Sequence, residues 1–328
     1  MLLAFRNIQV KEVWEQIKNA DFSWLIGSMI LALISHVFRA LRWNQLIVQM
    51  NYKTSVTTTF YAVMVGYLAN LALPRMGEVS RCVVLSRKEK IPFNALFGSV
   101  VAERVFDLVV LIFIVLSVLL VQMKEIGGFL NKVLIKPLLG NNTGNVMAIV
   151  IVVLSIIFLV IAFIIIFKKL KPWLKATSLY IKMEAFIDGF MGGLKSIAKV
   201  KNKGLFFIYT FIIWTLYLAM IILPFYSFEA TSFLGIIDGV NILAIGSLGI
   251  IAPVPGGIGS YHFIITELFT QLYHIAPKDA LAWATANHAA QTFLVLFAGS
   301  ISYILLLLNK RKPLNEIADQ TSTENFQE

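Results

Sequence analysis

Long apolar runs make up much of this chain and limit the folds open to it. A helix that crosses a lipid bilayer needs about 20 predominantly apolar residues. The runs therefore predict about eight membrane helices, which would use roughly half of the chain of 328 residues. They lie at residues 24–38, 55–73, 95–122, 146–167, 205–224, 235–253, 259–273 and 281–308.

The composition points to the same class of protein. Hydrophobic residues make up 58% of the chain, charged residues only 14%, and the mean hydropathy is +0.80. Soluble domains carry about 25% charged residues, because much of their exterior faces water. The single cysteine, Cys82, excludes an intramolecular disulfide and a cysteine-rich metal site. We therefore expect an all-α, polytopic membrane helix bundle, and not a soluble enzyme or a disordered chain.

The basic residues predict an orientation, because cytoplasmic loops carry an excess of Lys and Arg. The first residues lack the features of a secretory signal, so the run 24–38 is expected to remain as a signal anchor. Most basic residues then fall on the cytoplasmic side when both termini are placed there. Arg39, Arg42 and Lys53 are assigned to the outside and are the weak point of this prediction. Topology explains the net charge of +10, so no nucleic-acid partner is expected.

Residues 168–203 form a lysine-rich segment whose apolar residues recur at steps of three or four. These apolar residues are Leu179, Met183, Phe186, Phe190, Leu194 and Ile197. The pattern predicts an amphipathic cytoplasmic helix. Its apolar face either packs against the protein, with the lysines acting as a topology signal, or binds anionic lipid. Residues 1–312 are expected to form one membrane domain, and the tail 313–328 to be disordered.

Three polar segments interrupt the apolar runs, and the first predicts a broken or re-entrant helix near 74–81. It contains, in order, Asn70, Pro74, Arg75, Gly77, Glu78 and Arg81. Pro74 removes a backbone donor and Gly77 permits unusual torsions, so a helix is expected to break here. Glu78 and Arg81 are three residues apart and share a face of the helix that resumes. A cytoplasmic turn with a surface ion pair is the alternative, but apolar sequence follows directly.

The second segment, Glu103-Arg104-Val-Phe-Asp107, lies within an apolar run. Its spacing allows both carboxylates and the guanidinium to face the interior of the bundle. Buried charges need partners, and Arg75 and Arg81 are the obvious candidates. The alternative hypothesis is a purely structural ion-pair network between two helices.

The third segment predicts another broken or re-entrant helix near 253–260, because prolines and glycines are too dense there for a continuous helix. Free helix ends at membrane depth can bind an anion such as a phospholipid phosphate. The candidate residues at this break are Gly256, Gly257, Ser260 and His262, and Asn287 and His288 add a polar patch on the last span. Corresponding breaks in two halves of a chain point to a transport site.

The three motifs together resemble the transmembrane, flippase-like region of the lysylphosphatidylglycerol synthase family. The resemblance covers nearly the whole chain and rests on the motifs of 70–81, 103–107 and 253–259. It implies a multi-pass protein of the bacterial inner membrane that moves a polar lipid between leaflets, in the best-known members an aminoacylated phosphatidylglycerol. The soluble aminoacyl-transferase domain is absent, so lipid synthesis is not expected. His262 stands where relatives often have an acidic residue, with Glu267 further on.

The expected function is translocation of a polar or charged phospholipid-like amphiphile, without catalytic residues, cofactor or metal. The expected partners are membrane lipids, either phospholipids or aminoacyl lipids, and the sequence is compatible with a homo-oligomer. Two alternatives stay open: a non-catalytic partner of a lipid-modifying enzyme, and a membrane-embedded transferase acting on a lipid carrier. The candidate substrate-binding residues are Asn70, Arg75, Glu78, Arg81, Glu103, Arg104, Asp107, Gly256, Gly257, Ser260, His262, Asn287 and His288.

Overall fold

A computed structural model describes residues 9–122, 127–128, 188, 190–193, 195–251, 254–309 and 313–314. The chain divides into two compact units, one formed by Met1–Val121 with Gly189–Glu328 and the other by Gln122–Asp188. Only the first unit is described below. The predicted span 146–167, residues 168–187 of the lysine-rich segment and the tail from 315 onward lie outside the described residues.

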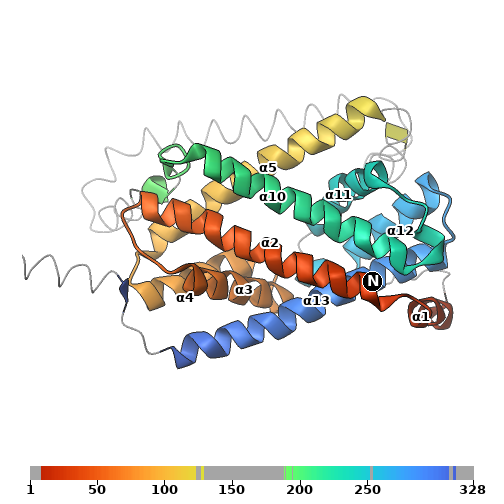
Figure 1. Ribbon diagram of the computed structural model, residues 1–328, viewed down its shortest axis with the longest axis horizontal. Coiled ribbons are helices and arrows are strands. Elements are labelled where there is room, and N and C mark those ends of the chain that lie inside the picture. The colour runs from red at the N-terminus through yellow and green to blue at the C-terminus, as the bar shows by residue number, and fades with distance from the viewer. Residues whose placement is uncertain are drawn as a thin grey trace, which may run out of the picture. The chain divides into compact units, whose positions relative to one another are not determined.

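The described residues form helices joined by short turns, which confirms the expected all-α membrane bundle (Figure 1). Four helical segments are long and apolar enough to cross a membrane: Phe22–Gln49, Phe93–Val121, Lys203–Ser227 and Pro277–Leu308. The helices are α1 (Val10–Lys18), α2 (Phe22–Gln49), α3 (Val56–Ala72), α4 (Met76–Glu89), α5 (Phe93–Val121), α10 (Lys203–Ile222), α11 (Ile236–Ile251), α12 (Ser260–Leu272) and α13 (Pro277–Leu308).

Helix α2 corrects two assignments made from the sequence. Asp21 caps its start, and the Ser23 hydroxyl and backbone N–H hold the pKa of the Asp21 carboxyl below its usual range. The helix does not end at Phe38 but continues to Gln49. Arg39 and Arg42, which were assigned to an outside loop, are therefore buried side chains within the bundle.

Helices α3 and α4 form the first hairpin, with its tip at Leu73–Arg75. The turn confirms the predicted break: α3 ends at Ala72, and Arg75 adopts a left-handed conformation before α4 begins. Asn70 accepts the Gly77 N–H at 2.7 Å, so a side chain of one arm satisfies the first turn of the other. The backbones approach closely at Gly66 and Gly77.

Helices α11 and α12 form the second hairpin, with its tip between Ile251 and Ser260. The tip contains Gly256, Gly257 and Gly259, all with positive φ, a conformation that glycine adopts without steric cost. The second predicted break is therefore also confirmed. Three of the predicted spans, 55–73, 235–253 and 259–273, are arms of hairpins, and α12 has only 13 residues. This is too short to cross a bilayer alone.

The two hairpins enter the bundle from opposite ends (Figure 1). At one end, the Asp21 N–H donates to the Ser227 carbonyl and Trp283 donates to that of Pro224. This end holds the start of α2, the start of α13 and the open end of the second hairpin. At the other end, Lys88 donates to the Asn309 carbonyl, which joins the end of α4 to the end of α13.

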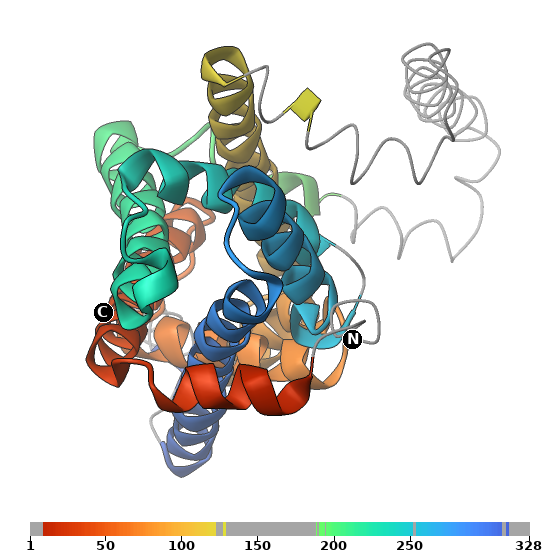
Figure 2. The ribbon, with the colours of Figure 1, turned by 90° about the vertical axis from the view of Figure 1, so that its right-hand side faces the viewer.

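The hairpin tips meet between these ends. A Cβ added at Gly256 would lie 3.4 Å from Leu71 Cδ2, and α13 packs against both hairpins through α3 and α12. Figure 2 looks onto the end that carries α1, which crosses α13. Because α1 and the end of α13 lie at opposite ends, the geometry does not agree with the prediction that both termini lie on one side.

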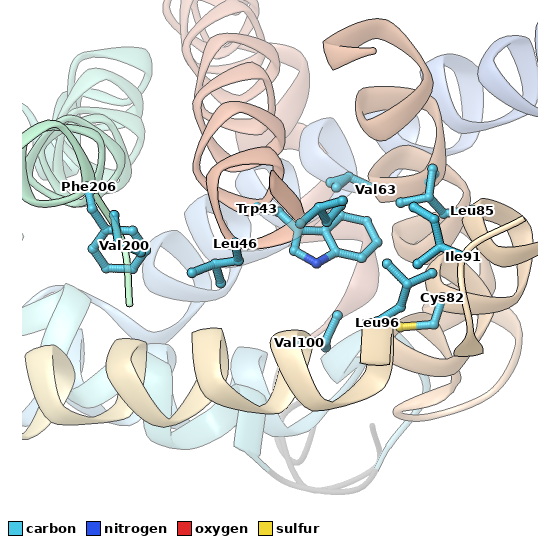
Figure 3. Close-up of a cluster of buried hydrophobic side chains, with 12 residues drawn as sticks. Trp43, Leu46, Val63, Cys82, Leu85, Ile91, Leu96, Val100, Val200 and Phe206 are labelled. Carbon is cyan, nitrogen blue, oxygen red and sulfur yellow. The ribbon is translucent and has the colours of Figure 1, made fainter. Parts of the chain in front are cut away.

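A hydrophobic core cluster fills the end of the bundle near the start of α5 (Figure 3). Trp43 lies at its centre and donates from its indole nitrogen to Ser99 at 3.0 Å. The described part of the lysine-rich segment contributes Val200, with Ile197 packed alongside. Gly193 also lies against the α5 backbone. These contacts support the interpretation of this part as a packed face.

Candidate functional site

A charged cleft opens between the first hairpin and helices α2 and α5. It encloses about 210 Å³ of empty space, including open space at its mouth. Its lining residues are Arg39, Val63, Gly66, Tyr67, Asn70, Gly77, Glu78, Arg81 and Arg104. Four of the predicted substrate-binding residues, Asn70, Glu78, Arg81 and Arg104, therefore lie around one space.

Glu103 stands at the centre of the charges behind this cleft. Its side chain is fully buried and contacts three guanidinium groups: Arg42 at 3.0 Å, Arg81 at 3.1 Å and Arg39 at 3.4 Å. Glu103 follows the start of α5 by about ten residues, or about 15 Å along the helix axis. The predicted pairing of Glu103 with Arg81 is present, whereas Arg39 and Arg42 were not among the expected partners.

The outer part of the arginine network is more exposed. Asp107 lies 2.7 Å from Arg42 and 3.7 Å from Arg104, which also reaches Glu78 at 3.3 Å. The Arg104 side chain is 37% exposed and that of Glu78 30%, against 0% for Glu103. The network thus runs from a buried centre to the mouth of the cleft.

Aromatic side chains hold the guanidinium groups where water is excluded. Arg39 donates to the hydroxyls of Tyr67 and Tyr217, and the second of these bonds measures 3.1 Å. The Arg81 guanidinium lies 4.7 Å from the centre of the Trp43 ring, within the range of a cation–π interaction. The hydrophobic core cluster of Figure 3 therefore also orients the network.

The network carries more positive than negative charge. It contains four guanidinium groups, of Arg39, Arg42, Arg81 and Arg104, and three carboxylates, of Glu78, Glu103 and Asp107. One positive charge is left over within the network. In addition, the buried Nε atoms of Arg39, Arg42 and Arg81 have no hydrogen-bond partner. Such a set of donors fits a negatively charged oxygen.

Arg39 and Arg42 were not among the predicted site residues, because a charged residue was taken as the end of an apolar run. Their spacing holds the signal that could have found them. Two arginines three residues apart, followed by further apolar residues, share one face of a continuing helix. A buried pair of arginines needs carboxylates as partners. Glu103 and Asp107 provide them and are likewise about one helical turn apart.

The other predicted residues gather at the tip of the second hairpin. The His262 and His288 rings are 4.9 Å apart, and Asn287 donates to the Tyr261 hydroxyl at 3.1 Å. The Ser260 hydroxyl donates to the Gly257 carbonyl at 3.2 Å. This group does not line the charged cleft, whose lining residues all belong to α2 to α5.

Arg75 is exposed at the tip of the first hairpin and does not line the cleft. Within the described part of the chain, no cluster of three or more His, Cys, Asp or Glu side chains could hold a metal ion.

Apolar helices, two opposed hairpins and a buried charge network define a polytopic membrane protein with an internal polar site. The chain belongs to the family of the lysylphosphatidylglycerol synthase TM region, whose model matches residues 1–299. This confirms the resemblance seen in the sequence.

Two curated proteins are similar to the chain. Glycosyltransferase AglD of Haloferax volcanii is 22% identical over 97% of this chain and 54% of its own length. A UPF0104 membrane protein of Methanocaldococcus jannaschii is 32% identical over 31% of each chain. The chain thus spans about half the length of the first relative and a smaller share of the second. No solved structure matches.

Proposed function

We propose that this protein translocates a polar lipid between the leaflets of a membrane, with the headgroup entering the charged cleft. The observation that carries this proposal is the arginine network, which has an excess positive charge inside an apolar bundle. Charges in a membrane are costly and mark substrate paths. A merely structural network needs no cleft beside it, whereas Arg81 and Arg104 both line one.

The two hairpins support a path across the bilayer. They enter from opposite ends and meet near Leu71 and Gly256, so helix ends are available at depth from both sides. Opposed broken helices are typical of transporters that expose one site alternately to the two sides. In this proposal the tip of the second hairpin, with His262 on α12 and His288 on the adjacent α13, forms the part of the path beyond the charged cleft.

The similarity to a protein named as a glycosyltransferase favours a second candidate function, the handling of a lipid carrier of sugars. In that case the protein acts as a membrane-embedded transferase or as the partner of a lipid-modifying enzyme. Mass spectrometry of the lipids distinguishes these functions, since translocation leaves the mass of each lipid unchanged and group transfer alters it.

Replacement of Arg104 tests the proposed function. In proteoliposomes that contain a fluorescent phospholipid, wild-type protein is expected to expose inner-leaflet lipid to a membrane-impermeant quencher. Arg104→Gln should slow this by at least about tenfold, because the variant loses a charged headgroup contact. Stability should change little, since ion pairs of such exposed side chains contribute about 0–1 kcal/mol.

Lys11→Gln is the matched control, because it removes the same charge from an exposed position on α1. Equal lipid exposure by the Arg104 variant and wild type would contradict the role assigned to the cleft.

We also propose that the end of the bundle near Asn309 faces the cytoplasm. Near this end the described basic residues outside the network are Lys53, Arg87, Lys88, Lys90, Lys195, Lys199, Lys201 and Lys203. Near the opposite end they are Lys11, Lys18 and Lys278. This asymmetry favours a cytoplasmic C-terminal end and an external α1. The bacterial inner membrane remains the expected location.

Labelling of single cysteines in intact cells tests this orientation. In a Cys82→Ala background, Lys11→Cys is expected to react with a membrane-impermeant maleimide added outside, and Lys90→Cys only after the cells are opened. The two positions lie near opposite ends of the bundle. The reverse pattern would refute the proposed orientation and leave the fold unaffected.

A further inference from the structure

The arginine network also indicates the charge of the translocated headgroup, an inference that rests on the proposed function. We infer that the charged cleft accepts a lipid phosphodiester with one net negative charge and discriminates against an aminoacylated lipid with a cationic headgroup. Glycerophospholipids and sugar-phosphate lipid carriers share this phosphodiester chemistry. The inference thus differs from what the family description suggests, since a lysyl headgroup is cationic.

The carboxylates near the cleft are already engaged by arginines. Glu103 contacts three guanidinium groups, Asp107 contacts two, and Glu78 lies 3.3 Å from Arg104. An ammonium group in the cleft would have to displace one of these arginines. An arginine displaced from Glu103 would stay buried without this counter-charge, which is strongly unfavourable.

A phosphodiester, by contrast, satisfies what the network lacks. Its single charge balances the one positive charge left over among the four arginines and three carboxylates. Its oxygens can accept from guanidinium N–H groups, which bind phosphate in a planar, two-donor arrangement. Arg104 at the mouth and Arg81 deeper in the cleft lie on the headgroup's route inward.

The surroundings of the cleft suit a headgroup whose chains stay outside. Next to the cleft, Leu73, Val105 and Leu108 are each at least 50% exposed. Apolar side chains exposed beside a polar cleft provide a surface for acyl or isoprenyl chains.

The group at the tip of the second hairpin provides no carboxylate for a cationic headgroup. Its described polar side chains include those of Ser260, Tyr261, His262, Asn287 and His288, none of which is a carboxylate. Glu267, one turn further along α12, accepts a hydrogen bond from Gln271 on the same helix. The described residues of this group therefore do not reverse the preference of the arginine network for a negatively charged headgroup.

The inference is tested by comparing lipids of different headgroup charge in the same proteoliposomes. The probes are fluorescent phosphatidylglycerol (−1), phosphatidylcholine (0), lysylphosphatidylglycerol (+1), a glycosyl-phosphoryl prenol (−1) and a prenyl monophosphate. We expect at least one of the two singly charged diesters to cross at least about tenfold faster than lysylphosphatidylglycerol, because like charges repel in the cleft. The faster of the two identifies the source of the phosphodiester.

A reciprocal variant separates charge from shape. Glu78→Gln removes one negative charge from the network, so its excess positive charge rises from one to two, and it leaves a side chain of the same size at the mouth. It should raise the rate for the monophosphate, which carries about −1.5 to −2 charges, relative to that for the diesters by about tenfold. Lys11→Gln serves again as the control and should leave the ratio unchanged. An unchanged ratio in the Glu78 variant would overturn the inference.

A binding measurement keeps the inference and the proposed function distinguishable. In detergent, phosphatidylglycerol should raise the midpoint of thermal unfolding and lysylphosphatidylglycerol should not. If phosphatidylglycerol binds but no lipid crosses, translocation is wrong and the charge preference stands. If lysylphosphatidylglycerol crosses and binds as well as phosphatidylglycerol, the charge preference is wrong and translocation stands. If no lipid binds or crosses, both are wrong.

Discussion

Glu103→Gln is expected to lower the free energy of unfolding by about 3–5 kcal/mol, the usual cost of breaking a buried ion pair by removing one partner. Glu103 is fully buried and is the shared counter-charge of Arg39, Arg42 and Arg81. Glutamine keeps the shape and accepts hydrogen bonds, but it leaves these three guanidinium groups with only Asp107 near Arg42. Repulsion between the guanidinium groups should then loosen the contact between α2, α4 and α5.

The chain contains its own reporter for this experiment. Cys82 is its single cysteine and is fully buried in the hydrophobic core cluster. In detergent, a maleimide dye that fluoresces on reaction should label Cys82 only as the bundle opens. The labelling midpoint of Glu103→Gln is expected to fall well below that of wild type, because the loss is a large fraction of the stability of a typical domain.

Glu229→Gln is the matched control, since it makes the same substitution at an exposed position in a short turn. Its midpoint should match that of wild type. If Glu103→Gln also melts at the wild-type temperature, Glu103 is not the counter-charge that holds the network together. A drop in both variants would instead point to an effect of net charge on the protein in detergent.

Local sequence signals were sufficient for much of the fold. Pro74 and the glycines at 256–259 mark helix breaks by removing a backbone donor or permitting positive φ, and both breaks are present. Glu103 and Asp107 stand out as carboxylates in an apolar run, and both are near guanidinium groups. In each case the chemistry of a single residue type predicts the local structure or the partner that it needs, without knowledge of contacts between distant segments.

What the sequence did not predict depends on contacts between distant segments. Apolar runs of similar length, 205–224 and 55–73, became a span in α10 and the arm of a hairpin in α3, because length and hydropathy do not record whether a helix turns back. Arg39 was read as the end of a run, since its partner Glu103 lies 64 positions further along the chain. The sequence also did not predict that α1 and the end of α13 lie at opposite ends of the bundle, because arms of hairpins were counted as spans.

Gly77→Ala is expected to open the first hairpin and to abolish lipid translocation. A Cβ at this position would lie 2.5 Å from the Asn70 amide nitrogen and would overlap the Gly66 carbonyl oxygen. Real Cβ atoms do not approach so closely, so α3 and α4 must separate. Separation weakens the hydrogen bond from the Gly77 N–H to Asn70 and moves Glu78 and Arg81 away from the cleft. Overpacking of this kind typically costs about 1–3 kcal/mol.

Translocation and stability should therefore fall together in Gly77→Ala, which distinguishes it from Arg104→Gln. The matched control is Gly204→Ala at the start of α10, where an added Cβ would meet its nearest atom at 3.6 Å. Because alanine favours the helix over glycine by about 1 kcal/mol, this control should keep its activity and melt at or slightly above the wild-type temperature. If Gly77→Ala translocated lipid at the wild-type rate, the close backbone contact between α3 and α4 would not be needed for activity. The position of Arg81 in the cleft would then not depend on that contact.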